Sequence, residues 1–270
     1  NAFCTEIGVT RNANVVQYDR LCAQARNHLH EMSPRIMGVL HPLKIKFTNK
    51  PPTSVTEQWE SGKYARVPHM PFDASRGFHV VPAADEDTIF IDHSDFRLVD
   101  DSDYFGLAPL KAVGLKYSGR IFCDEVEKDA DGKPVLLKCR YLADDDTTKV
   151  KTHIQWVGEK HGVQAEVRMY NSLFKVEEPN DDKWEDDLNP ESEVVLANAM
   201  VDPSVFMWNP VNESPFQFER IGFFVVDQDS ELAPAFKAPG KVPSLKAESN
   251  ESITIDDFEI SEFGLGGVDL

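Results

Sequence analysis

The spacing of the β-type runs limits the possible folds of this 270-residue chain more than any other feature. From residue 88 onward, short apolar runs follow one another with turn signals between them, such as "DADGKP" at 129–134. Runs of this length and spacing predict antiparallel β-barrels rather than alternating βαβ units. The runs lie at residues 88–92, 114–122, 135–143, 153–157, 164–174, 193–201 and 216–227.

The N-terminal part of the chain has a different pattern. Apolar residues recur at helical spacing over residues 18–32, and Pro34 prevents the helix from continuing. A strand is predicted at 43–47, where apolar residues alternate with lysines. Residues 48–88 are rich in Pro, Ser, Thr and Gly and predict a long connection. The acidic tail at 236–270 lacks a core-forming period and predicts an extension.

The charge is unevenly distributed along the chain. The formal net charge of −18 argues against a polyanionic partner, because phosphate binding depends on lysine and arginine. Residues 1–70, however, hold nine Lys and Arg against five acids, so this segment is +4 and the remaining 200 residues carry −22. A polyanion would dock at the basic end while the acidic bulk limits non-specific adhesion. The alternative is that the acidity only keeps the protein in solution.

The cysteines and the missing leader favour a cytoplasmic protein. Cys4, Cys22, Cys123 and Cys139 form no C-x-x-C pair, whereas zinc sites need ligand pairs two to four residues apart. Free thiols in a reducing cytosol are therefore expected. The chain opens on Asn1 without a signal peptide, and no apolar run approaches the length of a membrane span.

Motifs that carry catalysis or bind metals are missing from the sequence. Neither a phosphate-binding glycine loop nor a G-x-S-x-G motif occurs. His28 and His30 stand two apart on the predicted helix and would point away from one another, which argues against a metal site. The aspartate clusters at 144–146 and 181–182 lack the ligand spacing of a calcium loop and predict solvated turns. We expect no catalytic or metal site in this chain.

Basic and amide side chains do occur beside aromatic residues on the predicted β-structure. Aromatic faces stack unpaired bases, and planar guanidinium and amide groups hydrogen-bond base edges, so this combination is typical of binding to unpaired nucleotides. The candidate residues are Arg35, Tyr104, Phe105, Lys111, Lys116, Gln217 and Arg220.

Structural explanations stay open for the same residues. Arg35 would pair with Glu31, Lys116 would be an exposed strand lysine, and Gln217 would pair with a neighbouring strand. Strict alternation along 216–227 also places Gln217 and Arg220 on opposite faces. Both would reach one ligand only if a bulge or a strand end lies between them.

Eight longer motifs occur along the chain in this order: "FCTEIGVT", "SPRIMGVLHPLKI", "RGFHVVP", "FIDHSDFR", "VEKDADGKP", "IQWVGEKHGVQAEVRMYNSLF", "LNPES" and "FQFERIGFFVVD". Together they resemble the C-terminal half of eukaryotic-type glutaminyl-tRNA synthetases. The glutamate enzymes share the Pro-Arg turn after the helix, but "HIQWV" followed by "AEVRMYNSLF" and the "FQFER" strand resemble the glutamine branch.

The resemblance implies a mainly β fold, with two antiparallel β-barrels preceded by a short helical subdomain. The helical connecting subdomain would end at residue 34, the anticodon-binding double barrel would span 35–235, and 236–270 would be an acidic extension. By the same resemblance Arg35, Gln217 and Arg220 match positions that contact anticodon bases.

The sequence departs from the family after Tyr104. Phe105 and Gly106 replace a basic pair, Gly114 replaces a further basic residue, and Lys116 stands where the family usually has arginine. Lysine keeps the charge but loses the planar fork that reads guanine or phosphate in two places.

The implied function is binding of a glutamine-specific tRNA, and not of DNA or a membrane, by the anticodon-binding region of a glutamine–tRNA ligase. The family's catalytic motifs are missing from this chain, so no cofactor is expected in it, and ATP and magnesium are implied for the full-length enzyme. The alternative is an acidic β-barrel protein-interaction module that binds no RNA and takes protein partners through its tail. A stand-alone hydrolase would need a nucleophile that the sequence does not offer.

Overall fold

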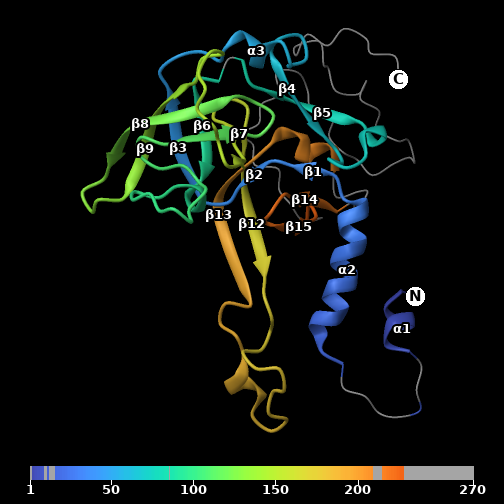
Figure 1. Cartoon of the computed structure of the whole chain (residues 1–270). Coiled ribbons are helices and arrows are strands. Elements are labelled where there is room, and N and C mark those ends of the chain that lie inside the picture. The colour runs from blue at the N-terminus through green and yellow to red at the C-terminus, as the bar shows by residue number, and fades with distance from the viewer. Residues whose placement is uncertain (1, 9–10, 12–15, 85, 209–214, 228–270) are drawn as a thin grey trace, which may run out of the picture. The chain divides into compact units, whose positions relative to one another are not determined.

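The computed structural model describes residues 2–8, 11, 16–84, 86–208 and 215–227 (Figure 1). This part of the chain is mainly β with few helices, as predicted. The α-helices are α1 (Ala2–Ile7), α2 (Tyr18–Met32) and α3 (Thr53–Thr56). The 3-10 helices are η1 (Ala74–Arg76), η2 (His93–Asp95), η3 (Trp184–Asp187) and η4 (Pro203–Trp208).

The largest sheet has seven strands in the order β10-β7-β8-β9-β3-β6-β11 and curves into a half-barrel. The neighbours β3 and β9 run parallel, as do β7 and β10, so this sheet is mixed and not purely antiparallel as predicted. Its strands are β3 (Pro42–Phe47), β6 (Thr88–Asp92), β7 (Ala112–Leu115), β8 (Arg120–Lys128), β9 (Pro134–Tyr141), β10 (His153–Ile154) and β11 (Val157–Gly158).

Three smaller sheets hold the remaining strands of the described residues, in the orders β12-β13-β2, β1-β14-β15 and β4-β5. Two closed antiparallel barrels are therefore not confirmed. In Figure 1, β12 and β13 extend together as a long ribbon. These strands are β1 (Arg35–Ile36), β2 (Gly38–Val39), β4 (Tyr64–Pro68), β5 (Phe78–Pro82), β12 (Val163–Tyr170), β13 (Glu193–Val201), β14 (Phe216–Phe218) and β15 (Gly222–Phe224).

Helix α2 ends where the sequence predicts. The backbone N–H of Ser33 donates to the Leu29 carbonyl at 2.8 Å and closes the last turn. Pro34 follows, and Ser33 is already extended, at φ −80° and ψ 126°, as expected for a residue before proline. The chain therefore passes from helix into β1 within two residues, and Arg35 is the first residue of that strand.

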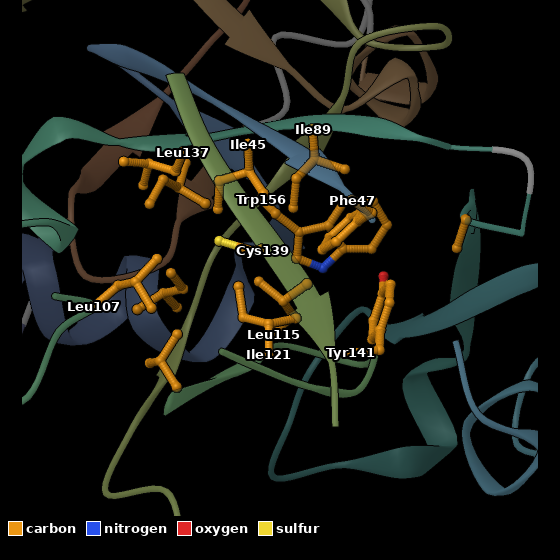
Figure 2. Packing of buried hydrophobic residues seen from close by; sticks show 14 of the residues in the cluster. Ile45, Phe47, Ile89, Leu107, Leu115, Ile121, Leu137, Cys139, Tyr141 and Trp156 are labelled. Carbon is orange, nitrogen blue, oxygen red and sulfur yellow. The ribbon is translucent and has the colours of Figure 1, made fainter. Parts of the chain in front are cut away.

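A large apolar core lies against the seven-stranded sheet. Strand β3 gives its apolar residues Leu43, Ile45 and Phe47 to this core and turns its lysines away, which confirms the predicted alternation. Figure 2 shows Ile45, Trp156 and other buried side chains of the cluster packed together. The sheet that carries part of the candidate site is therefore anchored by a continuous apolar interior.

A second core joins β1 to the β14–β15 hairpin and to the ribbon. Phe216 and Phe218 are buried in it, and Ile36 contributes from β1. The next residue, Met37, belongs to the large core instead, so successive residues of this segment enter different cores. Gly38 is required here because an added Cβ would lie 2.6 Å from the Phe218 ring. Arg35 thus begins the segment that connects the two interiors.

The prediction that residues 48–88 form only a long connection is wrong, because this segment contains strands. It contains the antiparallel pair β4–β5, joined in register from Tyr64↔Pro82 to Pro68↔Phe78. The prolines that suggested a loop, Pro68 and Pro82, stand at the last positions of their strands, where the loss of a backbone N–H is tolerated. Helix α3 adds one turn before this pair.

The four cysteines are free thiols, as predicted. Cys123 and Cys139 are buried and face one another across β8 and β9. In the described part of the chain, no helix is both long and apolar enough to cross a membrane. The predicted extension at 236–270 lies outside the described residues.

Candidate nucleic-acid interface

Arg35 is held by neutral acceptors beneath the protein surface. Its residue is 3% exposed, and Nη1 donates to the Ser33 carbonyl at 2.6 Å. Nη2 lies 3.0 Å from His30 Nδ1 and donates to the His30 carbonyl at 3.2 Å. The guanidinium carbon lies 5.6 Å from the centre of the Phe72 ring. The pairing with Glu31 that the sequence left open is not among these contacts.

Gln217 stands directly beside Arg35. Strands β1 and β14 are parallel, with Arg35 opposite Gln217 in register, and the Gln217 N–H donates to the Pro34 carbonyl at 2.8 Å. The side-chain oxygen Oε1 of Gln217 is buried and accepts no hydrogen bond from the described residues. A buried acceptor without a donor costs free energy, which a ligand N–H would recover. Arg35, His30, Phe72 and Gln217 are called the Arg35 cluster below.

The turn at residues 219–221 follows β14 and carries Arg220. Strand β14 ends at Phe218, so 216–227 is a hairpin of two short strands and not one strand. Arg220 has a φ of 69°, in the left-handed region that non-glycine residues seldom adopt. This strand end is the irregularity that the alternation argument required. The strained backbone points the Arg220 side chain out of the strand pattern, and 48% of that side chain is exposed.

Glu219 connects the turn to the large sheet. Its carboxylate accepts a hydrogen bond from Lys116 Nζ, and its carbonyl accepts one from the side-chain amide of Gln155. Gln155 is buried, and its Oε1 accepts the Gly38 N–H at 3.1 Å, so one side chain ties the turn to β2. Lys116 is partly buried and paired, and is not the freely exposed strand lysine that the sequence left open.

Arg220 pairs with a carboxylate of the large core's rim. Its Nη2 lies 3.3 Å and 3.2 Å from the two carboxylate oxygens of Asp95, which follows β6 in helix η2. Burial raises the pKa of Asp95, and the Arg220 charge offsets part of that rise. The pair joins the hairpin turn to the segment that precedes Tyr104.

Tyr104 is a buried support and not an open stacking face. Its hydroxyl donates to the Ser94 carbonyl at 3.3 Å, and burial raises the pKa of the phenol. Arg97 and Lys111 lie over its ring, with their cationic centres 4.3 Å and 5.3 Å from the ring centre. Lys111 Nζ also bonds the Tyr104 carbonyl at 2.6 Å and Asp100 Oδ1 at 2.5 Å. Asp95, Asp100, Tyr104, Lys111 and Arg220 are called the Tyr104 cluster below.

Positions 105, 106 and 114, where the resemblance implies basic residues, differ in their packing. Phe105 is 53% exposed, and Lys151 Nζ lies 5.3 Å from its ring centre. Gly106 is packed so closely that an added Cβ would collide with the Tyr104 hydroxyl and approach the Asp95 carbonyl to 2.6 Å. Gly114 is likewise covered by the His153 ring. A long basic side chain at Gly106 or Gly114 would not fit this packing.

The contacts connect all seven predicted site residues except Phe105 into one series. Arg35 and Gln217 are neighbours in register, Glu219 binds Lys116, and Arg220 binds Asp95, which packs against Gly106 beside Tyr104. Burial and then the charge of Glu219 raise the pKa of Tyr117 to about 12, while burial lowers the pKa of Arg35. The charge of Glu219, whose carboxylate binds Lys116, acts on the pKa of both Tyr117 and Arg35.

Several residues of the site were missed by the sequence analysis. His30 and Phe72 complete the Arg35 cluster, while Asp95 and Glu219 neutralise the predicted cations. Gln155 holds the turn at residues 219–221 by donating its side-chain amide to the Glu219 carbonyl. The motifs "FIDHSDFR", "HIQWV" and "FQFER" contain Asp95, Gln155 and Glu219, so for these three residues the signal lay in the motifs quoted for the resemblance and not in residue type.

The basic end of the sequence is also neutralised in part. Arg20 pairs with Glu6 at 2.9 Å, Lys44 pairs with Glu159 at 2.5 Å, and Lys50 pairs with Asp87. Arg26 takes part in none of the ion pairs of the described residues. No group of three or more His, Cys, Asp or Glu side chains in the described ranges could hold a metal ion.

Two family models match this chain. Both carry the description "tRNA synthetases class I (E and Q), anti-codon binding domain", one over residues 33–142 and the other over 153–227. The first begins two residues before Arg35 and includes the Tyr104 cluster apart from Arg220, and the second includes the β14–β15 hairpin. Neither match supports the alternative of a protein-interaction module without RNA binding.

Curated relatives share the same region. A probable glutamine–tRNA ligase of Dictyostelium discoideum is 38% identical over 85% of this chain and 28% of its own length. The cytoplasmic glutamine–tRNA ligase of Arabidopsis thaliana is 34% identical over 99% of this chain and 31% of its own. The glutamine–tRNA ligase of Pseudomonas aeruginosa is 39% identical over 83% and 40%. The chain therefore spans well under half of each relative.

Apart from His30, the residues of both clusters fall within the matched ranges, and the relatives named above are all glutamine–tRNA ligases. This chain belongs to the class I tRNA synthetases for glutamate and glutamine, of which it carries the anticodon-binding domains.

Proposed function

We propose that this chain binds the anticodon loop of a glutamine-specific tRNA, as the anticodon-binding region of a glutamine–tRNA ligase. The ligase reaction would use ATP and magnesium in a part of the enzyme outside the matched ranges. The name of the Arabidopsis relative supports a cytoplasmic location. The half-barrel sheet and the core around β1, β12–β13 and β14 would correspond to the two barrels of the family fold.

The observation that carries the proposal is the continuous series of cationic and amide groups from Arg35 to Lys111. These groups come from positions 35, 104–111, 116 and 217–220, which are distant in sequence, and packing brings them together. Three of the four non-glycine residues with positive φ in the described ranges, namely Leu110, Tyr117 and Arg220, lie in or beside the series. Backbone strain of this kind concentrates at functional sites.

The site residues have separate proposed roles. Lys116, Lys111 and Arg220 would exchange their carboxylate partners for RNA phosphates or base acceptors, since each is already held in place by an acid. Gln217 would use its unbonded amide oxygen toward a base amino group. Phe105 is exposed and would stack on an unpaired base, whereas Tyr104 would support Lys111. Arg35, which is almost fully buried, would act from beneath the surface beside Gln217.

Paired cations suit selective binding by an acidic protein. Exposed lysines attract any polyanion, but a cation bonded to a carboxylate gains only from a ligand placed well enough to replace that bond. Non-specific RNA would therefore be repelled by the acidic bulk. A correctly shaped loop would bring several phosphates and base edges to the series at once.

Salt-matched filter binding with glutamine tRNA and a second tRNA tests the proposal. We expect the wild-type chain to prefer glutamine tRNA, and substitutions in the anticodon of that tRNA to remove the preference. Arg220→Ala should weaken cognate binding about 5- to 100-fold, the range for losing one specific bidentate contact. The folded state should survive, because the Arg220 side chain is half exposed.

Asp182→Ala is the matched control. Asp182 is exposed in the segment between β12 and β13, and its N–H donates to Asn180 of the same segment, so its loss should leave affinity unchanged. Equal affinity of the wild-type chain for the two tRNAs, or equal affinity of wild type and Arg220→Ala for the cognate tRNA, would overturn the assignment.

A further inference from the structure

An exposed aromatic pair covers the buried guanidinium of Arg35. The rings of His30 and Phe72 stack with centroids 5.3 Å apart and planes inclined by 29°. Phe72 is 57% exposed, and His30 is exposed at the end of α2. An exposed phenylalanine on a proline-rich loop gains little from solvent, so a stacking partner would improve its environment.

The hydrogen bond from Arg35 determines which ring nitrogen of His30 accepts and which one donates. A guanidinium is always a donor, so His30 Nδ1 must accept its hydrogen bond. In this arrangement the imidazole is neutral and carries its proton on Nε2. The pair therefore presents an aromatic face, from Phe72, beside one ring N–H donor, from His30. That combination suits the flat face and the acceptor edge of a nucleobase.

The charges around the pair also favour a nucleotide over an apolar peptide. Arg26 lies one helical turn before His30 and therefore on the same side of α2, and it is exposed. Arg76 belongs to the same loop as Phe72. Two acids are near in sequence: Asp73 is engaged by the Ser75 N–H and hydroxyl, and Glu31 is exposed. Arg26 is thus available to a backbone phosphate.

We propose that Phe72 and His30 form a nucleobase-stacking subsite for one unpaired base of the bound RNA, held in place by Arg35 as a positioning residue. The inference rests on the proposed function and assigns a contact outside the seven residues discussed above. Phe72 stacks on the base, and His30 Nε2–H donates to its edge or to the adjacent sugar-phosphate. Arg35, which is almost fully buried, acts through the ring of His30 and the face of Phe72.

This assignment explains how a buried arginine contributes to binding. A guanidinium bonded to Ser33 and His30 has few N–H groups left for a ligand. Its position nonetheless sets the orientation of the imidazole and places positive charge against the Phe72 ring. Loss of Arg35 should therefore disturb one stacked base more than the rest of the RNA.

A glutamine tRNA transcript with 2-aminopurine at single unpaired positions of the anticodon loop tests the subsite. Stacking on an aromatic ring quenches this base analogue. With the full chain, we expect one position whose fluorescence is lower in the wild-type complex than in the Phe72→Leu complex. Phe72→Leu should also weaken binding about ten-fold, within the range for losing one base–aromatic stack, and Phe72→Trp should retain the quenching.

Trp184→Leu is the matched control, because Trp184 is also an exposed aromatic residue, 45% exposed on the acidic ribbon tip. Its loss should change neither affinity nor quenching. Thermal melting should give the same midpoint for wild type and Phe72→Leu, since the Phe72 side chain is mostly exposed.

Arg35→Lys tests the positioning role. A purely structural role predicts a uniform loss of affinity with quenching preserved at saturating protein, whereas positioning predicts that quenching at the Phe72-dependent position is lost even at saturation. Cognate binding with no position sensitive to Phe72→Leu would overturn the subsite and leave the proposed function standing. Failure of the wild-type chain to prefer glutamine tRNA would overturn both.

Discussion

The Arg35 cluster and the Tyr104 cluster use similar side chains but hold them by different interactions. Arg35 is 3% exposed and donates to neutral groups of Ser33 and His30. Lys111 and Arg220 are held by the carboxylates of Asp100 and Asp95. Arg35 feels the charge of Glu219 but hydrogen-bonds only neutral groups, whereas Lys111 and Arg220 are bonded directly to carboxylates, which fix the cation and also offset its charge. The two ends of the interface therefore differ in rigidity and in available charge.

The two clusters should also differ in how much their interactions contribute to the free energy of unfolding. Partly exposed ion pairs contribute about 0 to 1 kcal/mol each, because water screens them and side chains lose entropy on pairing. A buried donor or acceptor that loses its partner costs about 1 to 3 kcal/mol. The Arg35 cluster thus belongs to the stable framework of the chain. The Tyr104 cluster can exchange its internal partners for a ligand at low cost.

Arg35→Lys should have the largest effect on stability. A lysine ammonium cannot reach Ser33 and His30 with the same planar fork, so at least one buried acceptor loses its donor. We expect the free energy of unfolding to fall by about 2 kcal/mol, measured by urea denaturation.

Arg220→Lys provides the comparison for Arg35→Lys. Arg220 is half exposed and its pair with Asp95 can be re-formed by lysine, so we expect a change below about 0.5 kcal/mol. Similar losses in the two variants would remove the distinction between the clusters.

Glycine substitutions test packing at each cluster with an intermediate effect. In Gly38→Ala the new methyl group would lie 2.6 Å from the Phe218 ring, which the second core holds in place. In Gly106→Ala it would press on the Tyr104 hydroxyl and the Asp95 carbonyl. Each should cost about 1 to 3 kcal/mol in urea unfolding, because the new methyl group meets a core ring at Gly38 and a backbone carbonyl at Gly106, and neither moves aside easily.

Gly222→Ala is the control for these substitutions. Gly222 lies in the same hairpin, but the nearest atom to an added Cβ is 3.4 Å away on Phe224, an ordinary contact distance. We expect its stability to remain within about 0.5 kcal/mol of wild type. A Gly106→Ala chain as stable as Gly222→Ala would mean that Tyr104 is free to move and that the Tyr104 cluster is not packed as described.

The sequence predicts where helices and strands lie better than it predicts which strands pair with one another. The end of α2 and the alternation of β3 follow from local rules, namely a proline after a helical period and apolar residues at every second position. The β4–β5 pair escaped prediction because its prolines stand at strand ends, where the same residue type that breaks a strand is tolerated. Local patterns cannot reveal which strand lies beside which.

Local sequence patterns also predict the candidate site only in part. The alternation argument asked for a bulge or a strand end between Gln217 and Arg220, and β14 does end between them, at Phe218. Residue type could not reveal that Tyr104 is a buried support, nor that Arg35 lies beneath His30. Burial and ion pairing depend on groups far apart in sequence, so the charges of a linear segment overstate what the folded surface offers to RNA.

The pH dependence of the free energy of unfolding is expected to show the smallest effect. It tests the comparison specifically, because the Tyr104 cluster contains carboxylates and the Arg35 cluster does not. Burial raises the pKa of Asp95 above its ordinary value of 3.8, so the folded chain holds that proton more tightly than the unfolded chain. Stability from this group therefore falls as the pH rises from 3.8 through the folded pKa. Asp95→Asn removes the titration and should flatten this fall, by less than about 1 kcal/mol in urea unfolding.

Asp100→Asn should show the opposite sign. The hydrogen bond from Lys111 lowers the pKa of Asp100, so its contribution is present above the ordinary value of 3.8 and is lost as the pH falls through the folded pKa. Urea unfolding at a series of pH values should therefore separate the two variants, with the difference between them changing sign across the acidic range. Identical profiles would mean that solvent screens both pairs equally. In that case the Tyr104 cluster would offer RNA cations whose carboxylate partners exert no measurable hold.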